Sequence, residues 1–362
     1  MALDMPSDGY NTALWIFYIP FVLAEVSANL ILNLNTIRPG IGGQVFLLGV
    51  LGVCQGLARS YDGLLTVRFL LGVFESSLPA SATYMISMYY TRPEVAVRFA
   101  WFFNSLRMRN LGFYQLRSAI ISYIFLEASR GAEAKGSAAD SVPICKVLVD
   151  WRICILTLCF FCANVKASSI ASFSPTIFIE LGWTATTVQL MMMPVWVTGS
   201  VSTFAITWLA SRLDMRMSFL LICICLQAIG WSIMVAYVPE AGVRYLALFF
   251  MAAGTFPQMS ILMGWLSANL RGRKYLAVGM AWMSGFANCA NFISSNVFIT
   301  TERPRYPTGF SIGLAFTILG FILTCAAFVL LILSNKRRDK TREQMTDDQC
   351  QNDDKLHFQY LY

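Results

Sequence analysis

The chain has 362 residues, of which 57% are hydrophobic and only 13% are charged, and its mean hydropathy is +0.59. This composition excludes a water-soluble globular domain and predicts an integral membrane protein. The formal net charge of +7 is spread over short clusters between apolar runs. It therefore indicates an orientation in the bilayer and not a nucleic-acid partner.

Cysteine and histidine usage argues against a metal centre, a disulfide framework and hydrolytic catalysis. Eight of the ten cysteines fall inside apolar runs, where they pack as small hydrophobic residues. Cys159 and Cys162 form a C-x-x-C pair, but no second pair and no histidine accompany them. The only histidine, His357, lies in the polar C-terminal segment. We therefore expect no metal, no cofactor and no enzyme activity.

Apolar runs long enough to cross a bilayer core of about 30 Å predict the helices. In chain order they lie approximately at residues 11–33, 42–58, 63–90, 153–179, 185–210, 217–238, 245–268, 276–299 and 310–334. Between the third and fourth runs, residues 98–127 are hydrophobic but are interrupted by Arg107, Arg109 and Arg117, each of which costs about 2.5–3.5 kcal/mol at a helix centre. A signal peptide is not expected, because the first nine residues contain no Lys or Arg. The sequence predicts an all-α integral membrane fold with about 9–10 transmembrane helices.

Composition also predicts the domain organisation. We expect an N-terminal transmembrane bundle at residues 1–127, a cytoplasmic linker at 128–150, a C-terminal six-helix bundle at 151–335 and a cytoplasmic polar tail at 336–362. Lys and Arg are retained on the cytoplasmic side of membranes. In the C-terminal part, one set of loops holds ten such residues and the opposite set holds three. Both parts obey the rule only if residues 91–152 cross the membrane an even number of times.

Four Asp, Glu, Lys or Arg side chains lie inside the nine runs, namely Glu25, Arg68, Glu75 and Lys166. They are candidates for function because charge at that depth is costly. Glu25 shares a helix face with Asn29, and Arg68 and Glu75 lie two turns apart with Gly72 between them. A structural interpretation competes with each functional one. Glu25 and Asn29 can form an interhelical hydrogen bond, Arg68 and Glu75 can neutralise each other, and Lys166 can snorkel or face a cavity.

Two further polar residues, Asn288 and Asn291, are close enough to share one face of the run 276–299. They are candidates for hydrogen bonding to a substrate. Polar packing between helices is the competing explanation.

Several blocks of the sequence carry a family resemblance. Residues 68–98, RFLLGVFESSLPASATYMISMYYTRPEVAVR, contain the spacing R-x-x-x-G-x-x-E, and residues 17–29 read FYIPFVLAEVSAN. Between residues 264 and 309 lie GWLSANLRGRK, ANCANFISSNVF and ERPRYPTG, and residues 211–216 read SRLDMR. These blocks resemble the major facilitator superfamily, in the fungal anion:cation symporter branch that includes allantoate, pantothenate and nicotinic acid permeases.

The resemblance implies two bundles of six helices. Here the C-terminal half is complete, whereas the N-terminal half has three clear spans and is incomplete. The sequence VDWR at residues 149–152 looks like the stretch that leads into the seventh helix of the superfamily. This places the missing part between about Arg107 and Val147.

The resemblance also implies a function, proton-coupled symport of a small organic anion, nicotinate-, pantothenate- or allantoate-like, by alternating access. Arg68 or Lys166 would offset the substrate carboxylate, and Glu25 or Glu75 would carry the proton. Arg212, Asp214 and Arg216 would form a cytoplasmic gate. We expect a monomeric, multi-pass protein of the plasma membrane, with the vacuolar membrane as the other choice. The alternative is a truncated, non-transporting membrane protein, from a faulty gene model or with a sensor role.

Overall fold

A computed structural model describes residues 12, 16–21, 23–24, 37–58, 60–76, 86, 96–102, 147–180, 183–270, 273–298, 302 and 305–343. The labelled helices are α2 (Ile37–Leu57), α3 (Tyr61–Glu75), α8 (Trp151–Glu180), α9 (Ala185–Leu213), α10 (Arg216–Val235), α11 (Ala241–Asn269), α12 (Arg273–Asn288), α13 (Ala290–Val297) and α14 (Pro307–Glu343). Short helical stretches also occur at residues 16–21 and 96–102. The described residues form helices and turns and contain no strand, as the sequence predicts.

Five of the described helices are long and apolar enough to cross a membrane, with spans at Trp151–Pro175, Thr186–Leu213, Arg216–Val235, Ala241–Asn269 and Pro307–Arg337. They coincide with five of the nine apolar runs. The run 276–299 is divided between α12 and α13. Prolines 175, 194 and 257 lie inside α8, α9 and α11, which transmembrane helices tolerate because neighbouring groups replace the lost backbone hydrogen bond.

Helix α11 is the centre of the C-terminal bundle. It packs against α8, α9 and α10, and almost every side chain from Met251 to Asn269 is buried. Glycines permit this packing: a Cβ on Gly254 would lie 2.3 Å from the Cys223 carbonyl oxygen, and one on Gly230 would lie 2.7 Å from the Ala247 carbonyl oxygen. Small residues at such crossings let transmembrane helices approach closely.

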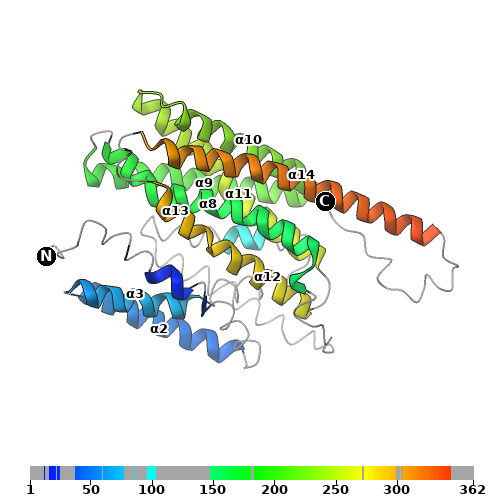
Figure 1. Cartoon of the computed structure of the whole chain (residues 1–362), viewed down its shortest axis with the longest axis horizontal. Coiled ribbons are helices and arrows are strands. Elements are labelled where there is room, and N and C mark those ends of the chain that lie inside the picture. The colour runs from blue at the N-terminus through cyan, green and yellow to red at the C-terminus, as the bar shows by residue number, and fades with distance from the viewer. Residues whose placement is uncertain are drawn as a thin grey trace.

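Helix α14 lies on the outside of this bundle. Only 28% of the most apolar part of this helix is buried inside the protein. The helix exposes large apolar side chains, including Ile318, Phe321, Ile322 and Val329. Such a continuous apolar surface is expected where a helix faces lipid. Figure 1 shows α14 running past the other helices at its C-terminal end, where its sequence becomes basic.

Helices α2 and α3 lie side by side, apart from the bundle of α8–α14 (Figure 1). Ser60 caps the N-terminus of α3, because its hydroxyl oxygen accepts from the Gly63 amide at 3.2 Å. Gly72 is buried, and a Cβ there would lie 2.3 Å from the Phe17 carbonyl oxygen. The absence of a side chain at Gly72 thus lets the segment at Phe17 approach α3 closely.

Candidate functional site

The transmembrane run 276–299 is interrupted in its middle. Helix α12 ends at Asn288 and α13 begins at Ala290, with Cys289 in a turn. Around Cys289 the backbone hydrogen bonds span three residues and not the four of an α-helix. They run from the Cys289 amide to the Phe286 carbonyl (3.2 Å) and from the Phe292 amide to the Cys289 carbonyl (3.1 Å). A break in a transmembrane helix leaves backbone groups that need other partners.

Helix α8 supplies these partners from one face. The Asn164 side chain donates from Nδ2 to the Ala287 carbonyl oxygen at 2.6 Å, at the end of α12. One turn later, the Ser168 hydroxyl donates to Asn291 Oδ1 at 2.5 Å. We call the four residues Asn164, Ser168, Asn288 and Asn291 the asparagine seam.

The asparagine seam lies beside a segment from the other end of the chain. The Tyr18 ring is 6.4 Å from the Phe292 ring, one residue beyond Asn291, in an edge-to-face arrangement. On the other side of the break, Phe161 and Phe286 pack with ring centroids 5.4 Å apart. All four seam side chains are half-buried. The seam thus combines amide and hydroxyl groups with aromatic faces next to residues 16–21.

Lys166 occupies the opposite face of α8 from the seam, since it is two residues from both Asn164 and Ser168. It is 0% exposed, and its Nζ donates to Gln258 Oε1 at 3.3 Å. The same oxygen accepts from Gln227 Nε2 at 2.8 Å, and Gln227 Oε1 accepts from the Thr255 hydroxyl at 3.2 Å. We call Lys166, Gln258, Gln227 and Thr255 the lysine network; it joins α8, α10 and α11 inside the C-terminal bundle.

The other predicted intramembrane charges lie elsewhere. Arg68 and Glu75 are half-buried on α3, away from the helices of the lysine network (Figure 1). Glu25 and Asn29 lie outside the described residues. Of the predicted polar candidates, Asn291 hydrogen-bonds to Ser168, Asn288 is the last residue of α12 at the break, and Lys166 lies on the opposite face of α8.

The three residues predicted to form a cytoplasmic gate have different environments. Asp214 is exposed and ends α9 in a left-handed conformation, with φ 50°. Arg212 is exposed, with its guanidinium 5.1 Å from the centroid of the Trp208 ring. Arg216 is only 3% exposed, and its guanidinium donates to the Gly264 carbonyl oxygen at 3.1 Å.

Gly264 is also a point of contact between the two parts of the chain. A Cβ at Gly264 would lie 2.6 Å from the Ala96 Cβ, so the stretch 96–102 crosses α11 closely there. The same stretch contacts α9, because the Trp101 and Phe204 rings are 4.5 Å apart. Of the three predicted gate residues, Arg216 is therefore the one whose hydrogen bond lies at this crossing.

A further polar cluster joins the first residues of α8 to those of α12. The Arg152 side chain forms an ion pair and hydrogen bonds with Asp150, and the Tyr275 hydroxyl donates to Asp150 Oδ2 at 2.6 Å. Burial alone would raise the pKa of Asp150, but these hydrogen bonds outweigh it and the pKa lies below its usual value. Burial, together with the hydrogen bond to Asp150, raises the pKa of Tyr275 to about 12.

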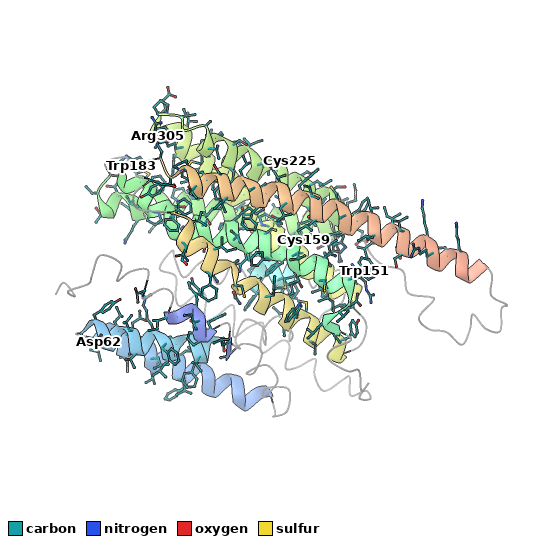
Figure 2. All side chains as sticks on the ribbon, viewed as in Figure 1. Asp62, Trp151, Cys159, Trp183, Cys225 and Arg305 are labelled. Atoms are coloured by element: carbon teal, nitrogen blue, oxygen red, sulfur yellow. The ribbon has the colours of Figure 1, made fainter. Side chains whose placement is uncertain are left out.

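Figure 2 shows that Trp151 and Trp183 mark opposite ends of α8, with Cys159 between them. Arg305 lies toward the same end as Trp183 in this view, and its guanidinium is 4.9 Å from the centroid of the Tyr237 ring. Arg244 approaches the same ring at 4.1 Å. Arg244 lies in the first turn of α11 and Arg305 in the turn before α14. The charge rule predicts that this end faces outside and that the end with the Asp150 cluster faces inside.

Residue spacing alone did not identify several members of these clusters. Asn164 and Ser168 are four residues apart in an apolar run, and this i, i+4 pair was an available signal of a polar face. Gln227 and Gln258 were also visible as polar residues inside apolar runs. Their meeting at Lys166 depends on helix packing, which residue spacing does not specify.

Comparison with known proteins identifies the class of fold. The structure matches a major facilitator superfamily transporter, FucP in its outward conformation, with a TM-score of 0.67 over 89% of this chain and 91% of that chain, at 15% identity. A bacterial homologue of the iron transporter ferroportin matches with a TM-score of 0.64. The chain thus has the all-helical fold of the major facilitator superfamily, as expected from its sequence.

The sequence is similar to fungal transporters over nearly its whole length. It is 22% identical to an uncharacterised transporter of Schizosaccharomyces pombe, covering 94% of this chain and 78% of that protein. It is 24% identical to an MFS-type transporter of Penicillium expansum, with coverage of 93% and 77%. It is 20% identical to the high-affinity nicotinic acid transporter of Saccharomyces cerevisiae, with coverage of 98% and 76%. No family model matches the chain. These relatives are transporters and not enzymes, in agreement with the absence of enzyme activity expected from the sequence.

Proposed function

We propose that this protein is a secondary active transporter that carries a small organic anion together with protons by alternating access, as a monomer in the plasma membrane. The observation that carries the proposal is the broken helix α12/α13, whose amide groups lie beside residues 16–21. Transporters of this type bind substrate at discontinuous helices near the bilayer midplane, between two helical halves.

The asparagine seam is suited to a small substrate with hydrogen-bonding groups. Its amides and hydroxyl can donate and accept, and Phe161, Phe286 and Phe292 supply apolar faces nearby. A nicotinate-, pantothenate- or allantoate-like anion has this chemistry, and one of the relatives is a nicotinic acid transporter.

The remaining roles follow the intramembrane charges. Arg68 or Lys166 offsets the substrate carboxylate, and Glu25 or Glu75 carries the coupled proton. Arg212, Asp214 and Arg216 form the cytoplasmic gate, in which Arg216 acts at the crossing of α11 with the stretch 96–102. In domain terms, residues 1–127 form the N-terminal bundle, 128–150 the cytoplasmic linker, 151–335 the C-terminal six-helix bundle and 336–362 the cytoplasmic tail.

The test is uptake of radiolabelled nicotinate, pantothenate and allantoate by the full chain in proteoliposomes, with and without an inward proton gradient. The wild type should accumulate one of them only with the gradient. Asn291→Ala should lower that uptake about tenfold, since one lost hydrogen bond of about 1.4 kcal/mol corresponds to this factor. Asn296→Ala is the matched control, because Asn296 is exposed on the same helix and donates to Phe292 and Ser295 of α13 itself. Equal uptake by both variants would remove the seam from the substrate site.

A second candidate function is a membrane protein of transporter ancestry that does not transport. The match to the Schizosaccharomyces pombe transporter runs over 388 residues, more than the 362 residues of this chain. The relative therefore has residues inside the matched region that this chain lacks. A site between two bundles needs helices from both, so an incomplete N-terminal bundle favours a sensor or scaffold role, or a faulty gene model.

Transcript sequencing separates the two candidates. The informative region is the 5′ end together with the codons for residues 105–150. Coding sequence for additional helices there restores the complete transporter, which then enters the uptake assay. A transcript that reads as given, combined with absence of uptake for all three anions, supports the non-transporting role.

A further inference from the structure

Lys166 is a buried charge for which the described part of the chain offers no counter-ion. No carboxylate in the described residues lies within ion-pair distance of its Nζ, and its one hydrogen-bond acceptor is Gln258 Oε1. An ammonium has three donors, and Gln258 Oε1 is shared with Gln227. The lysine network therefore satisfies a neutral amine better than it satisfies a charged ammonium.

Among the residues that the structure describes, the surroundings of Lys166 contain no other formal charge. From α8 and α10 the neighbouring titratable groups are the thiols of Cys159, Cys162 and Cys223. From α11 the neighbour is Gln258, and the charged residue of that helix, Arg244, lies 14 positions away, about 21 Å along the axis. From α14 the neighbour is Gly320, in a stretch without Asp, Glu, Lys or Arg until Lys336.

Lys166 also lies on the helix that holds the asparagine seam. Asn164 and Ser168 contact α12 and α13 from one face of α8, while Lys166 contacts α11 from the opposite face. A change in the charge of Lys166 alters the packing of α8 against α11, and any shift of α8 moves both seam contacts. Because Lys166 is 0% exposed, its proton exchanges with water only in a different arrangement of the helices. Proton coupling requires this link between protonation and conformation.

We propose that Lys166 is itself a proton-carrying residue of the transporter, alternating between ammonium and amine as α8 moves against α11, with Gln258 as its acceptor in the closed bundle. This inference rests on the proposed transport function and changes the role of Lys166 from a substrate contact to a coupling site. The proton binds the Nζ lone pair in one conformation and leaves to water in the other, so no further reactant is required.

The first experiment reads the protonation of Lys166 without any substrate. The full chain is labelled with ¹³C at lysine Cε and purified into nanodiscs, and the Lys166 resonance is assigned by its absence from Lys166→Met. In the wild type this resonance should titrate between about pH 5 and pH 8, the range in which a coupling group must exchange its proton. A resonance that stays at the ammonium position throughout this range overturns the proposal.

An isosteric variant tests whether Gln258 controls the protonation of Lys166. Gln258→Glu puts a carboxylate where the amide accepts from Lys166, so the lysine should remain charged across the same range. The matched control is Gln189→Glu, an exposed glutamine on α9, which should leave the Lys166 titration unchanged. An unchanged titration in Gln258→Glu overturns the role of Gln258 and, with it, the lysine network as the proton site.

Transport provides the second readout. In proteoliposomes with radiolabelled nicotinate, Lys166→Met and Lys166→Arg should both lose accumulation driven by a proton gradient, because neither side chain takes up and releases a proton near neutral pH. Accumulation at the wild-type level in either variant overturns the proposal. If the wild type fails to accumulate nicotinate, pantothenate and allantoate, the proposed transport function fails. The coupling role then fails with it, even where the resonance shows that Lys166 binds a proton.

Discussion

The packing of α14 on α10 gives a sharp prediction, because two glycines on one face of α14 have different surroundings. A Cβ on Gly313 would lie 2.2 Å from Trp231 Cζ3, 2.3 Å from Cε3 and 2.5 Å from Cη2. A Cβ on Gly320, two turns later, would lie 3.6 Å from the Cys162 Cβ and 3.9 Å from Lys166 Nζ. We therefore expect Gly313→Ala to destabilise the protein and Gly320→Ala to be tolerated.

The magnitude follows from the geometry. Carbon atoms pack at about 3.5–4.0 Å, so Gly313→Ala must move the Trp231 ring or α14 by more than about 1 Å. Trp231 is 1% exposed and has little room to move, and overpacking of this kind costs about 1–3 kcal/mol. The gain in helix propensity on replacing Gly by Ala, about 1 kcal/mol, is common to both variants. It cancels when they are compared, so Gly313→Ala should be about 1–3 kcal/mol less stable than Gly320→Ala.

The assay is thermal unfolding of the purified full chain in detergent, followed by size-exclusion chromatography of the surviving protein. A difference of 1 kcal/mol corresponds to roughly 2–4 °C for a domain of 150–250 residues, so Gly313→Ala should melt at least about 2 °C below Gly320→Ala. Trp231→Leu should remove most of this difference when combined with Gly313→Ala. Equal melting temperatures for the two glycine variants would refute the close packing of α14 on Trp231.

Three further predictions follow from individual contacts. Asp150 has a folded-state pKa below its usual value, so its carboxylate stabilises the fold above about pH 3.9, the unfolded-state pKa. This stabilisation is lost as the pH falls through the folded-state pKa. The melting temperature of Asp150→Asn should therefore fall less than that of the wild type on acidification. Gly264→Ala should separate the stretch 96–102 from α11, whereas Gly242→Ala, with nothing within 4 Å of its Cβ, should not. Cross-linking of cysteines placed at Trp101 and Phe204 measures this, and equal yields in both variants would count against the crossing. Thr184→Ala removes the N-cap of α9, at a cost of about 1 kcal/mol, and should speed hydrogen exchange at the Thr187 amide; Thr186→Ala is the control, and an unchanged exchange rate would contradict the cap.

The fold class was predictable from sequence because hydrophobic length is a direct consequence of bilayer thickness. Helices α8, α9, α10, α11 and α14 lie where apolar runs of that length occur. Two boundaries were not predictable in this way. Helix α14 continues from residue 334, the end of the predicted run, to Glu343, because Lys, Arg and Glu are good helix formers in water. The run 276–299 is continuous in hydropathy but broken at Cys289, since the Asn164 contact stabilises the freed Ala287 carbonyl.

The contacts of the candidate residues were also only partly predictable from sequence. Helical spacing alone places Asn164 and Ser168 opposite Lys166 on α8. Which neighbour each face meets depends on the packing of α8 against α11, α12, α13 and α14, where the glycine contacts and side-chain shapes decide the outcome. Lys166 was therefore recognisable as a costly buried charge, while its acceptor Gln258, 92 residues away, was not.

The described contacts between the two parts of the chain differ in kind from those inside the C-terminal bundle. Within the bundle, hydrogen bonds of the asparagine seam and the lysine network join α8 to α11, α12 and α13, and join α10 to α11. Across the two parts, Tyr18 meets Phe292, Trp101 meets Phe204, and Ala96 meets Gly264. Ring edges and small residues can slide and re-pack without leaving polar groups unpaired, whereas the buried hydrogen bonds cannot be broken without that cost. These three contacts are compatible with a movement of the C-terminal bundle against residues 16–21 and 96–102, the rigid-body motion that the proposed alternating access requires.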